Sequence, residues 1–150
     1  MSENKRWDFF KDGDTAYGVF YPEHYTVAAF PDVEAARAAG EAAIAAGYAA
    51  EDVRAVDGAF MAGKLESQSE ASLLDRVKAK IAQAVGTEVA FIELDRQHAR
   101  RGAGFLFVYT PEEADGDRVE ALLRSRDALY ARRYLPLAIE RLIEPPRLDD

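Results

Sequence analysis

Residues 25–56, YTVAAFPDVEAARAAGEAAIAAGYAAEDVRAV, decide the fold that we predict for this chain. They read as an apolar strand, an acidic turn, a helix, a short loop and a second strand, which together form a βαβ unit. Residues 105–134, FLFVYTPEEADGDRVEALLRSRDALYARRY, repeat the same order. Because one βαβ unit buries little apolar surface by itself, we expect both units to share one mainly antiparallel sheet and one core.

Both predicted helices have start signals, and the first also has a stop signal. Asp32 is a capping residue for the first helix, and Gly47 permits the positive φ that ends it. Small residues, including Gly40, form the stripe facing the sheet, so we expect close packing there. In the second unit, residues 110–113, TPEE, have the cap, proline and acid of a helix start, and Asp115-Gly116 delays the regular helix.

Two terminal segments flank the units. Residues 1–23 are rich in aromatic side chains and contain Asp12-Gly13, a strong hairpin signal, so we expect an N-terminal hairpin that extends the sheet. Residues 135–144 place apolar side chains at helical spacing, which predicts a short C-terminal helix. These apolar residues are Leu135, Ile139, Leu142 and Ile143.

A helical insertion at 58–102 separates the first unit (24–57) from the second (103–134). It begins with a Gly- and Ser-rich connector that has room for one helical turn. A capping box of Ser67 and Glu70 then starts an amphipathic helix. Residues 88–95 fit either a strand or a helix capped by Thr87, and we predict the helix.

Composition sets limits on the function. The chain has 150 residues, 49% hydrophobic and 31% charged, which fits a single globular α+β domain. It has no cysteine, which excludes disulfides, thiolate zinc sites and cysteine nucleophiles and suits the cytoplasm. A net charge of −8 disfavours nucleic-acid binding. With no signal peptide or apolar stretch of spanning length, we expect no membrane association.

The reactive side chains form no complete catalytic or metal motif. The two histidines, His24 and His98, lie outside ligand-spaced motifs, so we expect solvated or structural roles and predict no metal, cofactor or catalytic residue. The candidate ligand site is His98 with Arg100 and Arg101, where guanidinium groups and the amides of the following GAG sequence would hold a phosphate or carboxylate. The alternative is a basic helix end that complements the helix dipole.

Arg132 and Arg133 lie within the last predicted strand. Strand alternation would send one arginine to each face of the sheet, with one of them partly buried and paired with an acid. The alternative, which we favour, places both near a strand end, where they reach into water.

Three segments resemble the general-stress, heat-induced YflT-like domain family: AAFPDVEAARAAGEAAIAAGYAAEDVRAVDG, RRGAGFLFVYTP and ARRYLPLAIERL. The resemblance covers roughly residues 25–143 and implies a ferredoxin-like fold and a link to stress responses. It implies no catalytic residues. Family members commonly have a glycine-rich stretch between the halves, where this chain has the amphipathic segment 67–102.

The residues and the resemblance together lead to two functional hypotheses. The first is a non-enzymatic cytoplasmic binding or regulatory module, stress-associated, that works through a protein partner or as a homodimer. The second is a small anionic-metabolite-binding protein or enzyme with its site near Arg100, Arg101 and His98.

Overall fold

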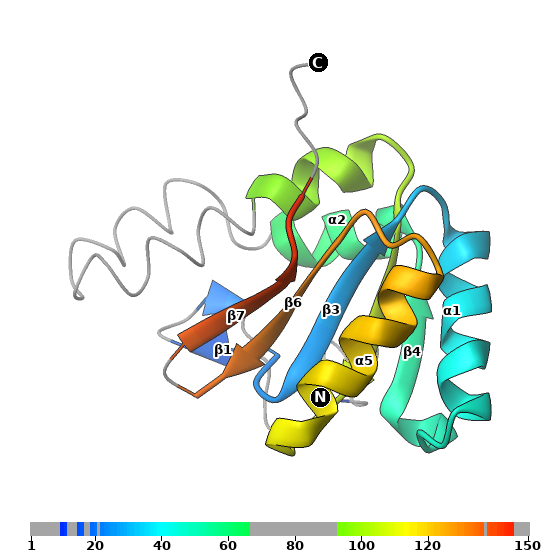
Figure 1. The fold of residues 1–150 in the computed structure, drawn as a ribbon. Coiled ribbons are helices and arrows are strands. Elements are labelled where there is room, and N and C mark those ends of the chain that lie inside the picture. The colour runs from blue at the N-terminus through cyan, green and yellow to red at the C-terminus, as the bar shows by residue number, and fades with distance from the viewer. Residues whose placement is uncertain are drawn as a thin grey trace.

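One antiparallel sheet organises the molecule (Figure 1). The computed structural model describes residues 10–11, 15–16, 19–20, 22–66, 93–136 and 138–145. The sheet has five strands in the order β4-β5-β3-β6-β7. In chain order these are β3 (Tyr25–Phe30), β4 (Val53–Val56), β5 (Gly104–Tyr109), β6 (Tyr130–Leu135) and β7 (Ala138–Ile143). The predicted α+β class and the mainly antiparallel sheet are therefore confirmed.

The two βαβ units interleave within this sheet. Helix α1 (Val33–Ala45) connects β3 to β4, and helix α5 (Glu113–Ser125) connects β5 to β6. Strand β3 pairs with β5 and β6, and β5 pairs with β3 and β4, always antiparallel. Each unit therefore places one of its strands between the two strands of the other unit. The expectation that both units share one sheet is confirmed.

Helices cover both faces of the sheet (Figure 1). The outer face, as we call it, packs against α1 and α5 through a core that includes Phe30, Leu106 and Leu123. The inner face packs against α2 (Gly58–Glu66) and a helix at 93–100, and its core includes Met61 and Phe105. Strand alternation separates the two cores, since successive side chains point to opposite faces.

The signals predicted for α1 are confirmed. Asp32 is the N-cap, and its Oδ1 accepts a hydrogen bond of 2.9 Å from the backbone N of Ala35. Gly47 has a φ of 118° just after the helix. A Cβ on Gly40 would lie 3.2 Å from Leu106 Cδ1 and 3.3 Å from Val53 Cγ1, so the small residue permits close packing on the sheet.

The start of α5 differs from the prediction. Glu112 is its N-cap, and the backbone N of Glu112 donates to Asp115 Oδ2 at 3.0 Å. Asp115 and Gly116 lie within the helix, because the Asp115 carboxylate accepts from the backbone N–H of the N-cap residue and so supports the helix start instead of delaying it. The hydroxyl of Thr110 is used elsewhere, in a buried hydrogen bond of 2.8 Å with Thr26.

The predicted C-terminal helix is wrong, because residues 138–143 form the edge strand β7. β7 pairs with β6, with Arg133 opposite Glu140 and Tyr134 opposite Ile139, and a register shift follows. Ile139 packs against the inner core, whereas Leu142 joins the outer core. Strand alternation by itself places Ile139 and Leu142 on opposite faces, and the register shift brings Ile143 to the outer face beside Leu142. Pairing with β6 satisfies the backbone.

The flanking segments also need correction. β1 (Thr15–Ala16) and β2 (Val19–Phe20) pair as a separate two-stranded sheet, so the hairpin does not extend the main sheet, and both strands follow Asp12-Gly13. Residues 58–66 of the predicted connector, for which one helical turn was expected, form the nine-residue helix α2. Residues 93–95 are helical, as predicted for that part of 88–95. The helix expected from Ser67 and the Thr87 cap lie outside the described residues.

Candidate functional site

Adjacent arginines on β6 create two different polar environments. Arg132 and Arg133 are 1% and 3% exposed, so the favoured prediction that both reach into water is wrong. Strand alternation directs Arg132 to the inner face and Arg133 to the outer face. Both side chains find oxygen acceptors within the fold, which is the requirement for burying a guanidinium group.

On the inner face, Arg132 forms a buried ion pair with Asp95 through Nη2 and Oδ2. Tyr130 donates its hydroxyl to Asp95 Oδ1 at 2.6 Å, and Arg132 Nε donates to the hydroxyl of Tyr134 at 2.7 Å. Asp95 belongs to the 93–100 helix, and the other three residues lie on β6. The network therefore connects this helix to the sheet through charge-assisted hydrogen bonds.

Burial and neighbouring charges shift the pKa values of Tyr130 and Arg132 in this network. Burial raises the pKa of the Tyr130 hydroxyl, and the neighbouring Asp95 carboxylate raises it further, so the phenol remains protonated. Burial by itself lowers the pKa of Arg132, but Asp95 and the two tyrosines more than offset it, and the net shift is upward. Both effects stabilise a network made of one carboxylate, one guanidinium and two neutral phenols.

His98 lies beside this network. Its side chain is buried, and its ring meets the Tyr130 ring edge-on at a centroid distance of 5.0 Å. Within the described residues its Nε2 makes no hydrogen bond. Burial lowers the pKa of His98, Asp95 raises it, and Arg101 lowers it, with a net shift downward. The imidazole is therefore held in its neutral form.

The other two residues of the sequence-predicted anion site lie on the surface. Arg100 and Arg101 are exposed at the end of the 93–100 helix, whereas His98 is in the core. The backbone N–H groups of residues 101–103 donate to the carbonyls of His98 and Ala99 and so end the helix. Two of the three amides that sequence analysis assigned to an anion, those of Gly102 and Ala103, are thus already engaged, and they lie at the negative end of the helix dipole.

The two histidines lie at opposite ends of β6. The backbone N of His24 donates to the carbonyl of Tyr134 at 2.6 Å, whereas His98 contacts Tyr130. Four strand residues span about 13 Å. The structure therefore does not bring the two imidazoles together.

On the outer face, Arg133 fixes the loop that leads into α5. Its Nε and Nη2 donate to the carbonyl of Thr110 at 3.1 and 2.9 Å. Nη2 also donates to the carbonyl of Glu112 at 2.6 Å. The remaining nitrogen, Nη1, lies 3.5 Å from Glu140 Oε1 on β7.

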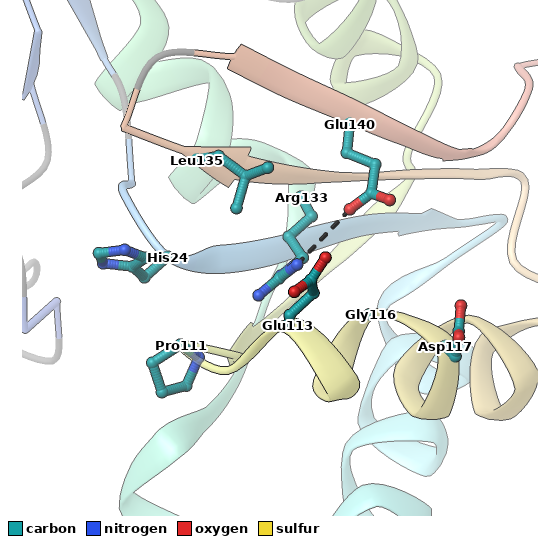
Figure 2. A pocket seen from close by; sticks show the side chains of 8 residues that line it. All are labelled: His24, Pro111, Glu113, Gly116, Asp117, Arg133, Leu135 and Glu140. Atoms are coloured by element: carbon teal, nitrogen blue, oxygen red, sulfur yellow. Dashed lines mark ion pairs between the residues drawn. The ribbon is translucent and has the colours of Figure 1, made fainter.

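Above this guanidinium, α5 and β7 enclose a cleft of about 540 Å³ (Figure 2). Three carboxylate side chains line it, Glu113 and Asp117 from α5 and Glu140 from β7; Arg133 pairs with Glu140, and Asp117 lies one turn farther along α5 than Glu113. Pro111 and Leu135 add apolar walls, and His24 lines one end. The cleft thus combines one buried cation with three exposed acids in its walls.

Gly116 leaves space beside this cation. A Cβ at this position would lie 3.4 Å from Arg133 Nη1 and 3.7 Å from Glu140 Oε1. The glycine does not have a positive φ, so backbone strain does not require it. Alanine is about 1 kcal/mol better than glycine in a helix interior, and the glycine here keeps the region around Nη1 open.

Sequence reasoning missed this cleft. The alternation of Arg132 and Arg133 was a usable signal, but the carboxylates lie on α5 and on a segment predicted as a helix.

Within the described residues, no group of three or more histidine, aspartate or glutamate side chains is arranged to hold a metal ion, and none of the helices has the length and apolarity to cross a membrane. Comparison with protein-family models, curated proteins and solved structures finds no match to the chain.

Proposed function

We propose that this chain is a non-enzymatic binding module that acts through a protein partner or a second copy of itself. The observation that carries the proposal is the edge strand β7. It is the last strand of the five-stranded sheet, and Ala138, Glu140 and Arg141 are exposed. An edge strand presents backbone N–H and C=O groups to which another polypeptide can add by β-augmentation.

The use made of the buried polar groups supports a binding role over a catalytic one. Asp95, Arg132 and Arg133 all bond to groups of the fold itself. Asp115 holds the first turn of α5, and Thr26 bonds to Thr110. Networks of this kind stabilise a scaffold, whereas catalysis needs groups directed toward a substrate.

We also propose a ferredoxin-like build for the module. The order β4-β5-β3-β6, with α1 and α5 as the two crossovers, supports a pair of split βαβ units. β7 and the inner-face helices are then additions to that core. A stress-associated role rests on the resemblance of residues 25–143 to the YflT-like family, and a cytoplasmic location rests on the lack of cysteine.

A proline substitution in β7 tests the binding function. In an antiparallel pair every second N–H group faces away from the partner strand, and the register that pairs Leu135 with Ala138 assigns this outward direction to Arg141. We therefore expect Arg141→Pro to abolish association measured by light scattering after size exclusion, or by capture of a partner identified by mass spectrometry. Arg141→Ala, which loses the same side chain but keeps the N–H group, should retain it.

The result has a clear reading in both directions. Unchanged association of a folded Arg141→Pro variant would show that β7 is not the contact. A wild-type chain that is monomeric at all concentrations and captures no partner would contradict the proposed function itself.

A further inference from the structure

The cleft between α5 and β7 combines features that a structural arginine alone does not require. Arg133 is 3% exposed, and the hydrogen bonds of Nε and Nη2 to backbone carbonyls already hold the loop in place. Its Nη1 borders the cleft, and within the described residues its one carboxylate contact is the long one to Glu140 at 3.5 Å. A buried N–H donor thus faces an open volume.

The glycine beside this donor keeps the volume open. Gly116 lies in the interior of α5, where alanine would favour the helix, and its missing side chain leaves space next to Nη1 and Glu140. A ligand atom at this point would meet a guanidinium N–H, for which a carboxylate oxygen is the natural acceptor.

The charges around the cleft limit which charged groups a ligand can have besides a carboxylate. Three carboxylates and one guanidinium group line the cleft, so a simple anion would be repelled by Glu113, Asp117 and Glu140. Glu113 and Asp117 are four residues apart on α5, which places them on the same side of the helix. A protonated amine on the ligand would be attracted to this pair, while a simple cation would make no use of Arg133.

We propose that this cleft binds a small zwitterion, in which a carboxylate contacts Arg133 Nη1 beside Gly116 and an ammonium group faces Glu113 and Asp117. A free amino acid has this chemistry, and Pro111 and Leu135 provide apolar contacts for its side chain. The inference goes beyond the proposed binding function and does not depend on it, because the cleft and the outward edge of β7 are different surfaces.

A ligand series tests the charge pattern. Each of the twenty L-amino acids is added separately at 10 mM to the full chain, and the melting temperature is measured. For every amino acid that raises it, the N-acetyl derivative and the carboxamide are compared by calorimetry. We expect at least one amino acid to bind, and both derivatives to bind at least tenfold more weakly. The absence of any shift, or a derivative within threefold of its parent, would overturn the proposal.

Matched glycine variants test the location. Gly116→Leu extends a side chain into the cleft, whereas Gly63→Leu is the same change in α2, at a position where a Cβ meets nothing within 4 Å. We expect Gly116→Leu to weaken binding at least tenfold and Gly63→Leu to leave it unchanged. Should Gly116→Leu fail to fold, Asp117→Asn, which changes an exposed carboxylate, should weaken binding at least threefold. Binding that either folded cleft variant leaves unchanged would place the ligand elsewhere and refute the assignment.

Discussion

Replacing Asp95 by alanine should cost about 3–5 kcal/mol of the free energy of unfolding, because it leaves one partner of a buried ion pair behind. Arg132 is 1% exposed and would keep its charge without the carboxylate that compensates it. The Tyr130 hydroxyl would lose its acceptor as well, at a cost within the range of about 1–3 kcal/mol for an unsatisfied buried group. A domain of this size has roughly 5–15 kcal/mol of stability in total.

Urea unfolding followed by circular dichroism measures this loss. With a slope of about 2 kcal/mol per molar urea, a loss of about 4 kcal/mol moves the midpoint down by about 2 M. Glu34→Ala is the matched control, since Glu34 and Arg37 form an exposed pair with side-chain exposures of 81% and 59%. We expect that control to change stability by less than about 0.5 kcal/mol.

A double variant separates the unpaired charge from simple loss of packing. Asp95→Leu combined with Arg132→Met replaces the pair by apolar side chains of similar size, which is often neutral or stabilising. We expect it to be at least about 2 kcal/mol more stable than Asp95→Ala, since no buried charge is left uncompensated. If the single variant resembles the Glu34→Ala control, or the double variant is no better than the single one, the electrostatic reasoning is wrong.

Two further predictions concern a glycine contact and a pH dependence. Gly104→Ala should lower the free energy of unfolding by more than about 2 kcal/mol, because its Cβ would lie 2.5 Å from Val33 Cα and 2.6 Å from the Asp32 carbonyl oxygen. The control Gly63→Ala should raise that free energy by up to about 1 kcal/mol. Equal melting temperatures of the two variants would contradict this prediction. Burial lowers the pKa of His98 in the folded chain, so the imidazole takes up a proton near pH 6.5 only when the chain is unfolded. The free energy of unfolding should therefore fall as the pH drops from about 6.5 toward the pKa of His98 in the folded chain. Urea midpoints at pH 7.5 and 5.5 should differ less for His98→Leu than for the wild type, and an equal difference would exclude this role.

Local signals in the sequence were sufficient for much of the fold. Asp32, Gly47 and Gly40 acted as their residue types predict, because capping, positive φ and close packing depend on the residue itself and its near neighbours. The prediction failed at residues 138–143, where the apolar spacing resembles a helical pattern. Pairing with β6 and a register shift decided that segment, and these are contacts between segments that local periodicity does not encode.

The candidate site depended still more on tertiary structure. Arg132 and Arg133 are adjacent in sequence, but their partners are Asp95 from the 93–100 helix and Thr110 and Glu140 from the β5–α5 loop and β7. One of the two interpretations of the sequence placed one arginine on each face of the sheet, but it did not identify the acidic residues that pair with the two guanidinium groups. His98 lies in the core and Arg100 on the surface because positions two apart in a helix of 3.6 residues per turn differ by about 200° of rotation, and Arg101 is exposed in the turn that follows the helix.

The sequence by itself determined the element types of the two βαβ units, the α+β class and the caps of α1, since these follow from periodicity and from local backbone chemistry. Only the tertiary structure decided that β7 is an edge strand, that both arginines of β6 are buried, and that α5 and β7 enclose a cleft. The physical reason is that burial of a charge, pairing of a strand and the shape of a cleft depend on which distant residues meet, and that is fixed by the packing of the whole chain.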